Sequence, residues 1–176
     1  MPAQQFVEEL NAQIGRELAA AQQYVAAAVF YDDMTLARLA AFFYEQSAEE
    51  RTHAMMMVQY LLDGGVRPTI AGVAAPLTEF DDWAGPIVLA LEQERAVTDQ
   101  ISNLAAIARN ENDYLSEQFM QWFLKEQVEE VATMSDLAAI AERCSDRPMD
   151  FEDYLARERS GGEDADPTAP PVAGGG

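Results

Sequence analysis

Glu50 and His53, the only histidine of the chain, stand three residues apart in a long segment with helical periodicity. Side chains at this spacing share one face of a helix. Apolar residues recur every three or four positions from Leu36 to Leu61, so this face is the one that a folded helix would bury. An isolated buried carboxylate is too costly in free energy to persist. We therefore predict that Glu50 has a charged partner or binds a metal ion.

Three further apolar stripes are each interrupted by residues of the types that bind metals. The interruptions are Glu17 in the first stripe, Glu94 in the third, and Gln127 with Glu130 in the fourth. The separation along the chain from Glu17 to Glu94 equals that from Glu50 to Gln127. This common offset indicates two copies of one helix pair, related by an approximate twofold axis.

The same periodicity predicts an all-α chain in which four long helices end at Asp-rich or Gly-rich turns. Two turns are predicted, at residues 33 and 111. Counted in residues from the turn of each helix pair, the polar residues of its two helices lie at nearly equal distances. All four helices can therefore present them in one layer. We expect four long helices at residues 5–31, 34–62, 83–110 and 114–143, and a brief fifth helix at 150–158. Asp32 or Asp33 would cap the second helix, and Asp81 or Asp82 would cap the third.

Residues 63–82 lack helical periodicity and contain several glycines and prolines, so we predict a long connection there. Extended at ~3.3 Å per residue, this connection can run the full length of helices that are each about 40 Å long at ~1.5 Å per residue. The second and third helices would then be parallel. The predicted fold is an antiparallel four-helix bundle with one long crossover and a short C-terminal fifth helix.

The composition narrows the range of partners. The chain has 31 acidic and 11 basic residues, giving a net charge of −20, which disfavours nucleic acid and anionic membranes and favours cations. The single cysteine, Cys144, cannot form an internal disulfide and suits a reducing cytosol. No secretory signal is visible, and no apolar stretch approaches the ~20 residues of a membrane span. We therefore expect a cytoplasmic protein.

The end of the chain differs in composition from the rest. We expect one domain at residues 1–158, followed by a disordered tail at 159–176 that is acidic and rich in Gly and Pro. Because the tail has almost nothing apolar to bury, its removal should cost little stability.

Several carboxylates and one imidazole around a small buried space suit a pair of iron ions. Fe(II) accepts oxygen and nitrogen ligands, and a carboxylate such as Glu50 can bridge two metals. Without metal, carboxylates this close could not all ionise, because like charges raise one another's pKa. The simpler alternative places Glu50 and His53 on an exposed helix surface, but four stripes in phase argue against it. Tyr24 and Trp122 are either core aromatics or oxidisable rings beside the metals.

Over about residues 5–158 the chain resembles bacterial non-haem ferritin. The resemblance implies a hollow shell of 24 identical subunits that oxidises Fe(II) with dioxygen or peroxide and stores Fe(III) mineral. It also implies three iron positions, two aromatic side chains near the centre and a polar pore. The first iron position is matched by Glu17, Glu50 and His53, and the second by Glu50, Glu94 and Glu130, with Gln127 beside it. The third iron position is matched by Glu49, Glu126, Glu129 and Glu130. The central aromatic side chains are matched by Tyr24 and Trp122, and the pore residues by Glu111, Asp113 and Glu117.

Related families differ at these positions. A bacterioferritin would carry a second Glu-x-x-His on the fourth helix, where this chain has Gln127 and Glu130, and a haem-binding methionine near Thr52. We therefore expect iron as the cofactor and no haem. The leading interpretation is an iron-storage protein with ferroxidase activity. The alternatives are a di-iron oxidase or oxygenase acting on an organic substrate, which usually has that second motif, and a metal-free helical assembly protein.

Overall fold

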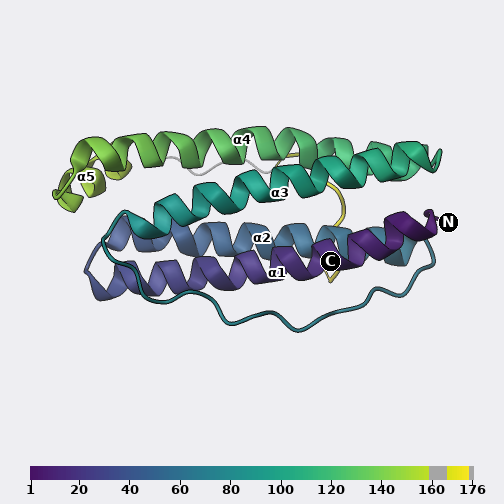
Figure 1. Ribbon diagram of the computed structural model, residues 1–176, viewed down its shortest axis with the longest axis horizontal. Helices are drawn as coiled ribbons and strands as arrows, with labels where there is room; N and C mark the ends of the chain where they lie inside the picture. Colours follow the sequence, from purple (N-terminus) through teal and green to yellow (C-terminus); the bar gives the residue numbers. More distant parts are fainter. Residues whose placement is uncertain (159–165, 175–176) are drawn as a thin grey trace.

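The computed structural model describes residues 1–158 and 166–174 of the chain. Within these residues the regular secondary structure is entirely helical, which confirms the predicted fold class (Figure 1). The four long helices match their predicted ranges within three residues at each end. Their bounds are α1 Gln4–Asp33, α2 Ala37–Asp63, α3 Gly85–Asn110 and α4 Tyr114–Cys144, and the short helix α5 covers Pro148–Glu158.

The helices form two antiparallel pairs, α1 with α2 and α3 with α4. The segment between α2 and α3 runs back along the bundle beside α1, so α2 and α3 point the same way (Figure 1). Side chains of α1 hold this long segment in place. The Gln23 amide exchanges two hydrogen bonds of 2.8 Å with the backbone of Leu77, and Asn11 Oδ1 accepts one of 2.6 Å from the Thr69 N–H. These contacts satisfy backbone groups that no helix pairs.

The start of α2 differs from the prediction that Asp32 or Asp33 would cap it. Helix α1 continues through Asp33, and Leu36, the residue before α2, offers no capping side chain. The cap comes from α5 instead, because the Glu152 carboxylate accepts hydrogen bonds of 2.8 Å from the N–H groups of Arg38 and Leu39. A carboxylate at a helix N-terminus pairs free N–H groups and favours the helix dipole.

Helices α3 and α4 begin with local caps. The Asp82 carboxylate accepts hydrogen bonds of 2.9 Å from the N–H groups of Ala84 and Gly85, as predicted for one of the two aspartates there. Asp113 caps α4 by accepting a hydrogen bond from the Ser116 N–H, and it also accepts one of 2.8 Å from the Ala3 N–H. Asp113 therefore ties the start of α4 to the start of α1.

The hydrophobic core consists of two clusters separated by a polar layer. One cluster lies toward α5 and contains Tyr31 and Phe43, whose rings stack. The other lies toward the opposite end and contains Met57 and Phe123. The buried glutamates belong to neither cluster. The two apolar regions stabilise the bundle on both sides of the polar layer and fix its position.

Residues 166–174 of the predicted tail lie against the bundle and are not free of contacts. The indole N–H of Trp122 donates a hydrogen bond of 3.1 Å to Asp166, and the Ala173 N–H donates one of 3.2 Å to the Met55 carbonyl. Ala169, Val172 and Ala173 pack against the second core cluster. The expectation that the tail buries almost nothing is therefore wrong for these residues. Their few apolar side chains pack on the surface between α2 and α4. The rest of the predicted disordered segment, residues 159–165 and 175–176, lies outside the described residues.

Candidate metal centre

Glu17, Glu50 and His53 form a compact group of possible metal ligands. Each offers one ligand atom, and these atoms all lie within 4.8 Å of one another. Glu17 comes from α1, and the other two residues stand one turn apart on α2. All three side chains are buried, and His53 Nδ1 lies 3.5 Å from Glu50 Oε2. The antiparallel pairing of α1 and α2 thus brings together residues that the sequence places in two separate stripes.

The second helix pair adds Glu94, Gln127 and Glu130, which are also buried. The Tyr24 hydroxyl donates a short hydrogen bond to Glu94 Oε1, so the first and third helices meet at this level. The charges of Glu94 and Glu130 both act on Glu50. The six inner residues predicted from the sequence therefore lie in one mid-bundle layer.

Three carboxylates of this layer each keep one oxygen without a hydrogen-bond partner. These atoms are Oε2 of Glu17, of Glu50 and of Glu94, and all three are buried. Buried polar groups are normally hydrogen-bonded. Burying carboxylate oxygens without partners costs folding free energy. Such oxygens, together with an imidazole nitrogen, are the ligands that iron accepts. The donor set therefore fits iron: Glu17, Glu50 and His53 form the one compact ligand group found among the described residues, and Glu94 adds a further unpaired buried oxygen, whereas Glu50, Glu94 and Glu130 do not form a second compact group.

Burial and mutual repulsion act on the acidity of these groups. Burial, followed by the charge of Glu50, raises the pKa of Glu17 well above its ordinary value. Burial and the charge of Glu94 raise the pKa of Glu50 in the same way. The pKa of Glu94 is also raised, chiefly by burial, although its hydrogen bond from Tyr24 opposes the shift. Divalent cations would reverse these shifts by favouring the charged carboxylates.

The predicted third iron position is more open. Glu49 and Glu126 are partly buried and Glu129 is exposed. Among the described residues, no second compact group of ligand atoms includes any of them. Gln46 donates a short hydrogen bond to Glu49, and partial burial raises the pKa of Glu126. These glutamates form an acidic edge beside the buried layer and not a closed pocket.

The two aromatic side chains named from the resemblance both adjoin the polar layer. Tyr24 is buried inside the layer against Glu94, and the Trp122 ring lies edge-on to His53 with 5.7 Å between their centroids. Burial and the charge of Glu94 raise the pKa of Tyr24 well above its ordinary value, so its hydroxyl stays protonated and remains a hydrogen-bond donor.

Two polar residues that the sequence pattern does not select also contact the layer. The Gln13 amide donates a hydrogen bond of 2.9 Å to Glu17 Oε1. The Thr98 hydroxyl lies 2.8 Å from the Glu94 carbonyl and 3.0 Å from Gln127 Oε1. Each lies four residues from a predicted site residue, on the same helix face. That spacing is the signal by which the sequence could have suggested them.

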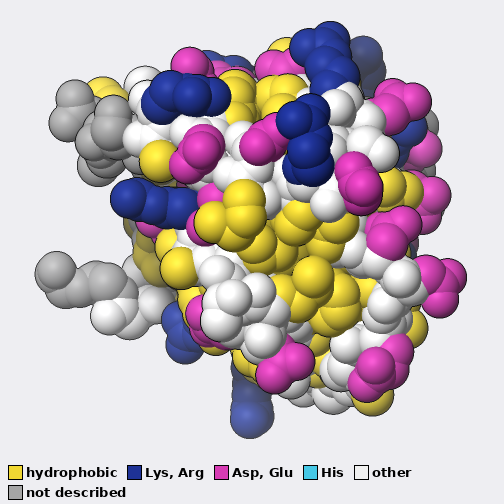
Figure 2. Space-filling view, turned by 90° about the vertical axis from the view of Figure 1, so that its left-hand side faces the viewer, with side chains coloured by type: hydrophobic (Ala, Val, Ile, Leu, Met, Phe, Trp, Pro, Cys, Tyr) yellow, Lys and Arg dark blue, Asp and Glu magenta, His cyan; other side chains and the backbone are white. Residues whose placement is uncertain are grey.

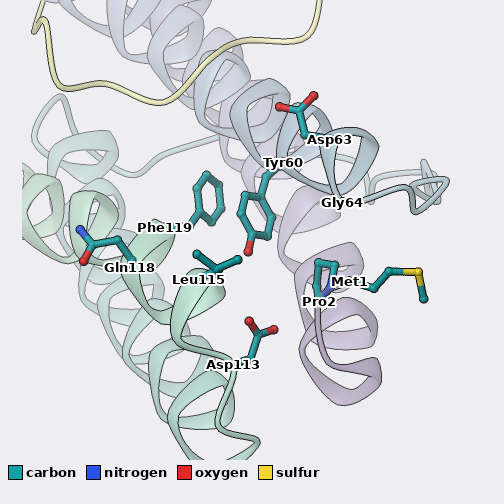
Figure 3. A pocket seen from close by; sticks show the side chains of 9 residues that line it. All are labelled: Met1, Pro2, Tyr60, Asp63, Gly64, Asp113, Leu115, Gln118 and Phe119. Atoms are coloured by element: carbon teal, nitrogen blue, oxygen red, sulfur yellow. The ribbon is translucent and has the colours of Figure 1, made fainter.

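A separate pocket of about 560 Å³ lies where α2 ends and α4 begins, away from the polar layer. Figure 3 shows Asp63 and Asp113 on opposite sides of Tyr60 in this pocket. Asp113 is already engaged as the cap of α4, so the pocket offers no converging set of carboxylates. The chemistry of the chain is concentrated in the polar layer.

Comparison with known proteins agrees with this geometry. The family model described as a ferritin-like domain matches residues 7–144. A relative named ferritin BfrB from Mycolicibacterium smegmatis is 55% identical over 93% of this chain and 90% of its own length. A bacterial non-heme ferritin from Staphylococcus epidermidis is 35% identical over 89% of this chain and 97% of its own length.

Solved structures show the same likeness. An open pore ferritin from Archaeoglobus fulgidus superposes with a TM-score of 0.84 at 30% identity, covering 89% of this chain and 97% of that one. The residues that match the ferritin-like family model, 7–144, contain every predicted iron-binding residue and all of the four long helices except the first three residues of α1. The chain therefore belongs to the ferritin family of iron-storage proteins.

Proposed function

We propose that the buried layer is a ferroxidase centre, at which two Fe(II) ions bind as substrates and are oxidised to Fe(III). Glu17, Glu50 and His53 would hold one ion, and Glu50, Glu94 and Glu130 the other. The observation that carries this proposal is the set of three buried carboxylate oxygens that have no hydrogen-bond partner. Each Fe(II) ion would give up one electron, and the two electrons with two protons would reduce dioxygen to hydrogen peroxide, or hydrogen peroxide to two water molecules. The Fe(III) ions would then move on to the mineral.

The protein residues would act through charge and position. Burial raises the pKa values of Glu17 and Glu50, whereas metal binding favours the deprotonated carboxylates, so Fe(II) binding should release protons. Glu50 faces both helix pairs and can serve both ions. Tyr24 would orient Glu94 through its hydrogen bond, and its ring could be oxidised by supplying an electron. Glu49, Glu126 and Glu129 provide an acidic exit toward the outside of the bundle.

We further infer that the protein is a non-haem ferritin. The names of its relatives do not decide this, because Mycobacterium tuberculosis proteins that are each 50% identical are named ferritin BfrB and bacterioferritin BfrB. The residues support the inference: the chain has one histidine, and Glu130 stands where a second Glu-x-x-His would need another. Absorption spectra of the purified protein in pyridine and alkali would reveal bound haem, and a haem signal would contradict the assignment.

The shell of 24 subunits is likewise a proposal, supported by ferritin relatives and by the surface of the bundle. Figure 2 shows hydrophobic side chains gathered on the end of the bundle at α5 and the α1–α2 turn, with charged side chains around them. Such an exposed patch is typical of a contact surface.

None of the described helices is long and apolar enough to cross a membrane. We propose a cytoplasmic location and a domain spanning residues 1–158.

Stopped-flow oxidation of Fe(II) tests the ferroxidase proposal. Glu50→Ala should slow the fast phase by about 100-fold or more, because removal of a ligand shared by both ions disables both positions. Glu45→Ala, which changes an exposed glutamate of α2, is the matched control and should oxidise iron normally. Undiminished oxidation by Glu50→Ala would contradict the proposal. A stable two irons per subunit, with no mineral after excess Fe(II), would favour the oxidase that acts on an organic substrate.

A further inference from the structure

Gln13 is a fully buried polar residue of α1 that stands one turn before Glu17. Its amide nitrogen donates a hydrogen bond of 2.9 Å to Glu17 Oε1. Amides are rarely left fully buried, and this one lies where an apolar side chain would continue the core stripe. Its burial therefore calls for an explanation in terms of the group that it contacts.

The orientation of the Gln13 amide is determined by its other neighbour. Arg16 Nη1 lies 2.8 Å from Gln13 Oε1 and also 2.7 Å from Glu9 Oε1. A guanidinium group is only a donor, so the amide oxygen must face Arg16 and the NH₂ group must face Glu17. Glu9, Arg16 and Gln13 thus form a chain of hydrogen bonds from the partly exposed surface of α1 to the buried layer.

The contact divides the two oxygens of Glu17 between different partners. Oε1 is occupied by the Gln13 amide, whereas Oε2 is buried without a hydrogen-bond partner. Oε2 is therefore the atom left to face a cation. In the absence of the amide, both oxygens would be free and the carboxylate could rotate.

We propose that Gln13 is a positioning residue that reserves one oxygen of Glu17 and presents the other to the metal centre, and that Arg16 holds the Gln13 amide in the required orientation. The inference rests on the proposed ferroxidase centre and adds to it a support outside the ligands. Hydrogen-bond partners of this kind typically change metal affinity by about 10–100-fold when they are removed.

Binding of Co(II) tests the inference without relying on iron oxidation, because air does not oxidise this ion in the binding assay. Gln13→Met keeps the side-chain volume and removes the donor. It should weaken Co(II) binding by about tenfold and alter the visible absorption bands, which report the coordination number and geometry of the ion. Gln4→Met is the matched control, because Gln4 donates a hydrogen bond of the same spacing to Glu8 on the exposed part of α1. It should bind Co(II) like the wild type.

Substitutions of the partly exposed Arg16 give a second test that does not alter the core. Arg16→Met should weaken Co(II) binding and change the spectrum, and Arg16→Lys, which can still donate to Gln13 Oε1, should restore both. Arg109→Met is the matched control, because Arg109 pairs with Glu117 on α3 and α4, outside the polar layer. This pair of variants decides the question even if Gln13→Met fails to fold.

Two results would count directly against the inference. Wild-type affinity and spectrum in Gln13→Met would overturn it, and so would equal weakening by Arg16→Lys and Arg16→Met. Glu17→Gln separates the inference from the function on which it rests. If Glu17→Gln loses Co(II) while Gln13→Met and Arg16→Met bind it normally, only the role of Gln13 is wrong. If Glu17→Gln also binds normally, the metal centre itself is misplaced and both proposals fall.

Discussion

At the scale of single residues, the buried glutamates suit cation binding better than they suit stability. Burial and mutual repulsion raise the pKa values of Glu17 and Glu50 above their ordinary value of 4.5. A group whose pKa is raised on folding stabilises the protein below its unfolded pKa, and this contribution is lost as pH rises through the folded pKa. The metal-free protein should therefore lose stability as pH rises above about 4.5.

The first prediction concerns this cost. Glu50→Gln should raise the unfolding free energy of the metal-free protein at neutral pH by about 1–3 kcal/mol, because the amide is neutral at every pH, whereas the buried carboxyl must either hold a proton above its ordinary pKa or ionise near Glu94. Its stability should also depend less on pH than that of the wild type. Thermal unfolding in the presence of a chelator, repeated from pH 4 to pH 8, measures both effects. A lower melting temperature for Glu50→Gln at neutral pH would contradict the prediction.

Gln127 carries the second prediction. It is a neutral amide where the sequence repeat places Glu50, and its Oε1 lies 3.0 Å from the Thr98 hydroxyl. A carboxylate at this position would add negative charge beside Glu94 and bind Fe(III) more strongly. Gln127→Glu should therefore retain iron and slow later turnovers, with the first turnover nearly intact.

Repeated additions of two Fe(II) per subunit would measure this effect on release. Val128→Ala is a suitable control, because Val128 is the exposed neighbour of Gln127 on α4. Equal recovery of activity in the wild type and in Gln127→Glu would mean that the amide does not control release.

At the scale of elements, one side chain of α5 caps the start of α2. Glu152 is buried and accepts hydrogen bonds from the N–H groups of Arg38 and Leu39, the first turn of a helix that has no cap of its own. Glu152→Ala should lower the unfolding free energy by about 1–2 kcal/mol and leave the first oxidation turnover unchanged. Thermal unfolding measures the loss, and Asp153→Ala, an exposed neighbour on α5, should show none.

The tail leads to a different prediction from the one that its composition suggests. Asp166 accepts a hydrogen bond from Trp122 and lies 3.6 Å from Lys125 Nζ, and hydrogen bonds from Thr168 lower the pKa of Asp166 to about 2. Ending the chain at residue 160 should leave the bundle folded but shift Trp122 fluorescence, because the indole N–H loses its partner and contacts water.

Comparison with a Trp122→Phe variant isolates the emission of Trp122 from that of Trp83, which is buried in the other core cluster. An unchanged spectrum after truncation would show that residues 166–174 do not rest on α4 in solution. Failure to assemble would show that the tail is needed for more than this contact.

At the scale of the whole molecule, the charge of −20 per chain should draw Fe(II) toward the protein. Of the three predicted pore residues, Asp113 caps α4, so its removal would damage the fold. Glu111 is exposed, and Glu117 pairs with Arg109. Replacing Glu111 and Glu117 together with Ala should slow iron uptake at low salt and have less effect at high salt, where charges are screened. Uptake that is unchanged at low salt would place the pore elsewhere.

The sequence by itself determined the helices, their order and the layer in which the site residues lie. Periodicity is a local property, and each of Glu17, Glu50 and Glu94 is visible because it interrupts an apolar stripe. The fold class and the ferritin family are confirmed. The assignment of individual residues to iron positions stays a prediction, although the bundle brings the ligand atoms of Glu17, Glu50 and His53 within 4.8 Å of one another.

The tertiary structure alone decided which atoms pair. That Glu152 and not Asp33 caps α2, and that Asp166 lies against Trp122, depends on contacts between residues far apart in the chain. The direction of the Gln13 amide depends on Arg16, and the unpaired Oε2 of Glu17 follows from it. A hydrophobic pattern records which side of a helix is buried, but hydrogen bonds depend on distance and direction, and these exist only once the helices have packed.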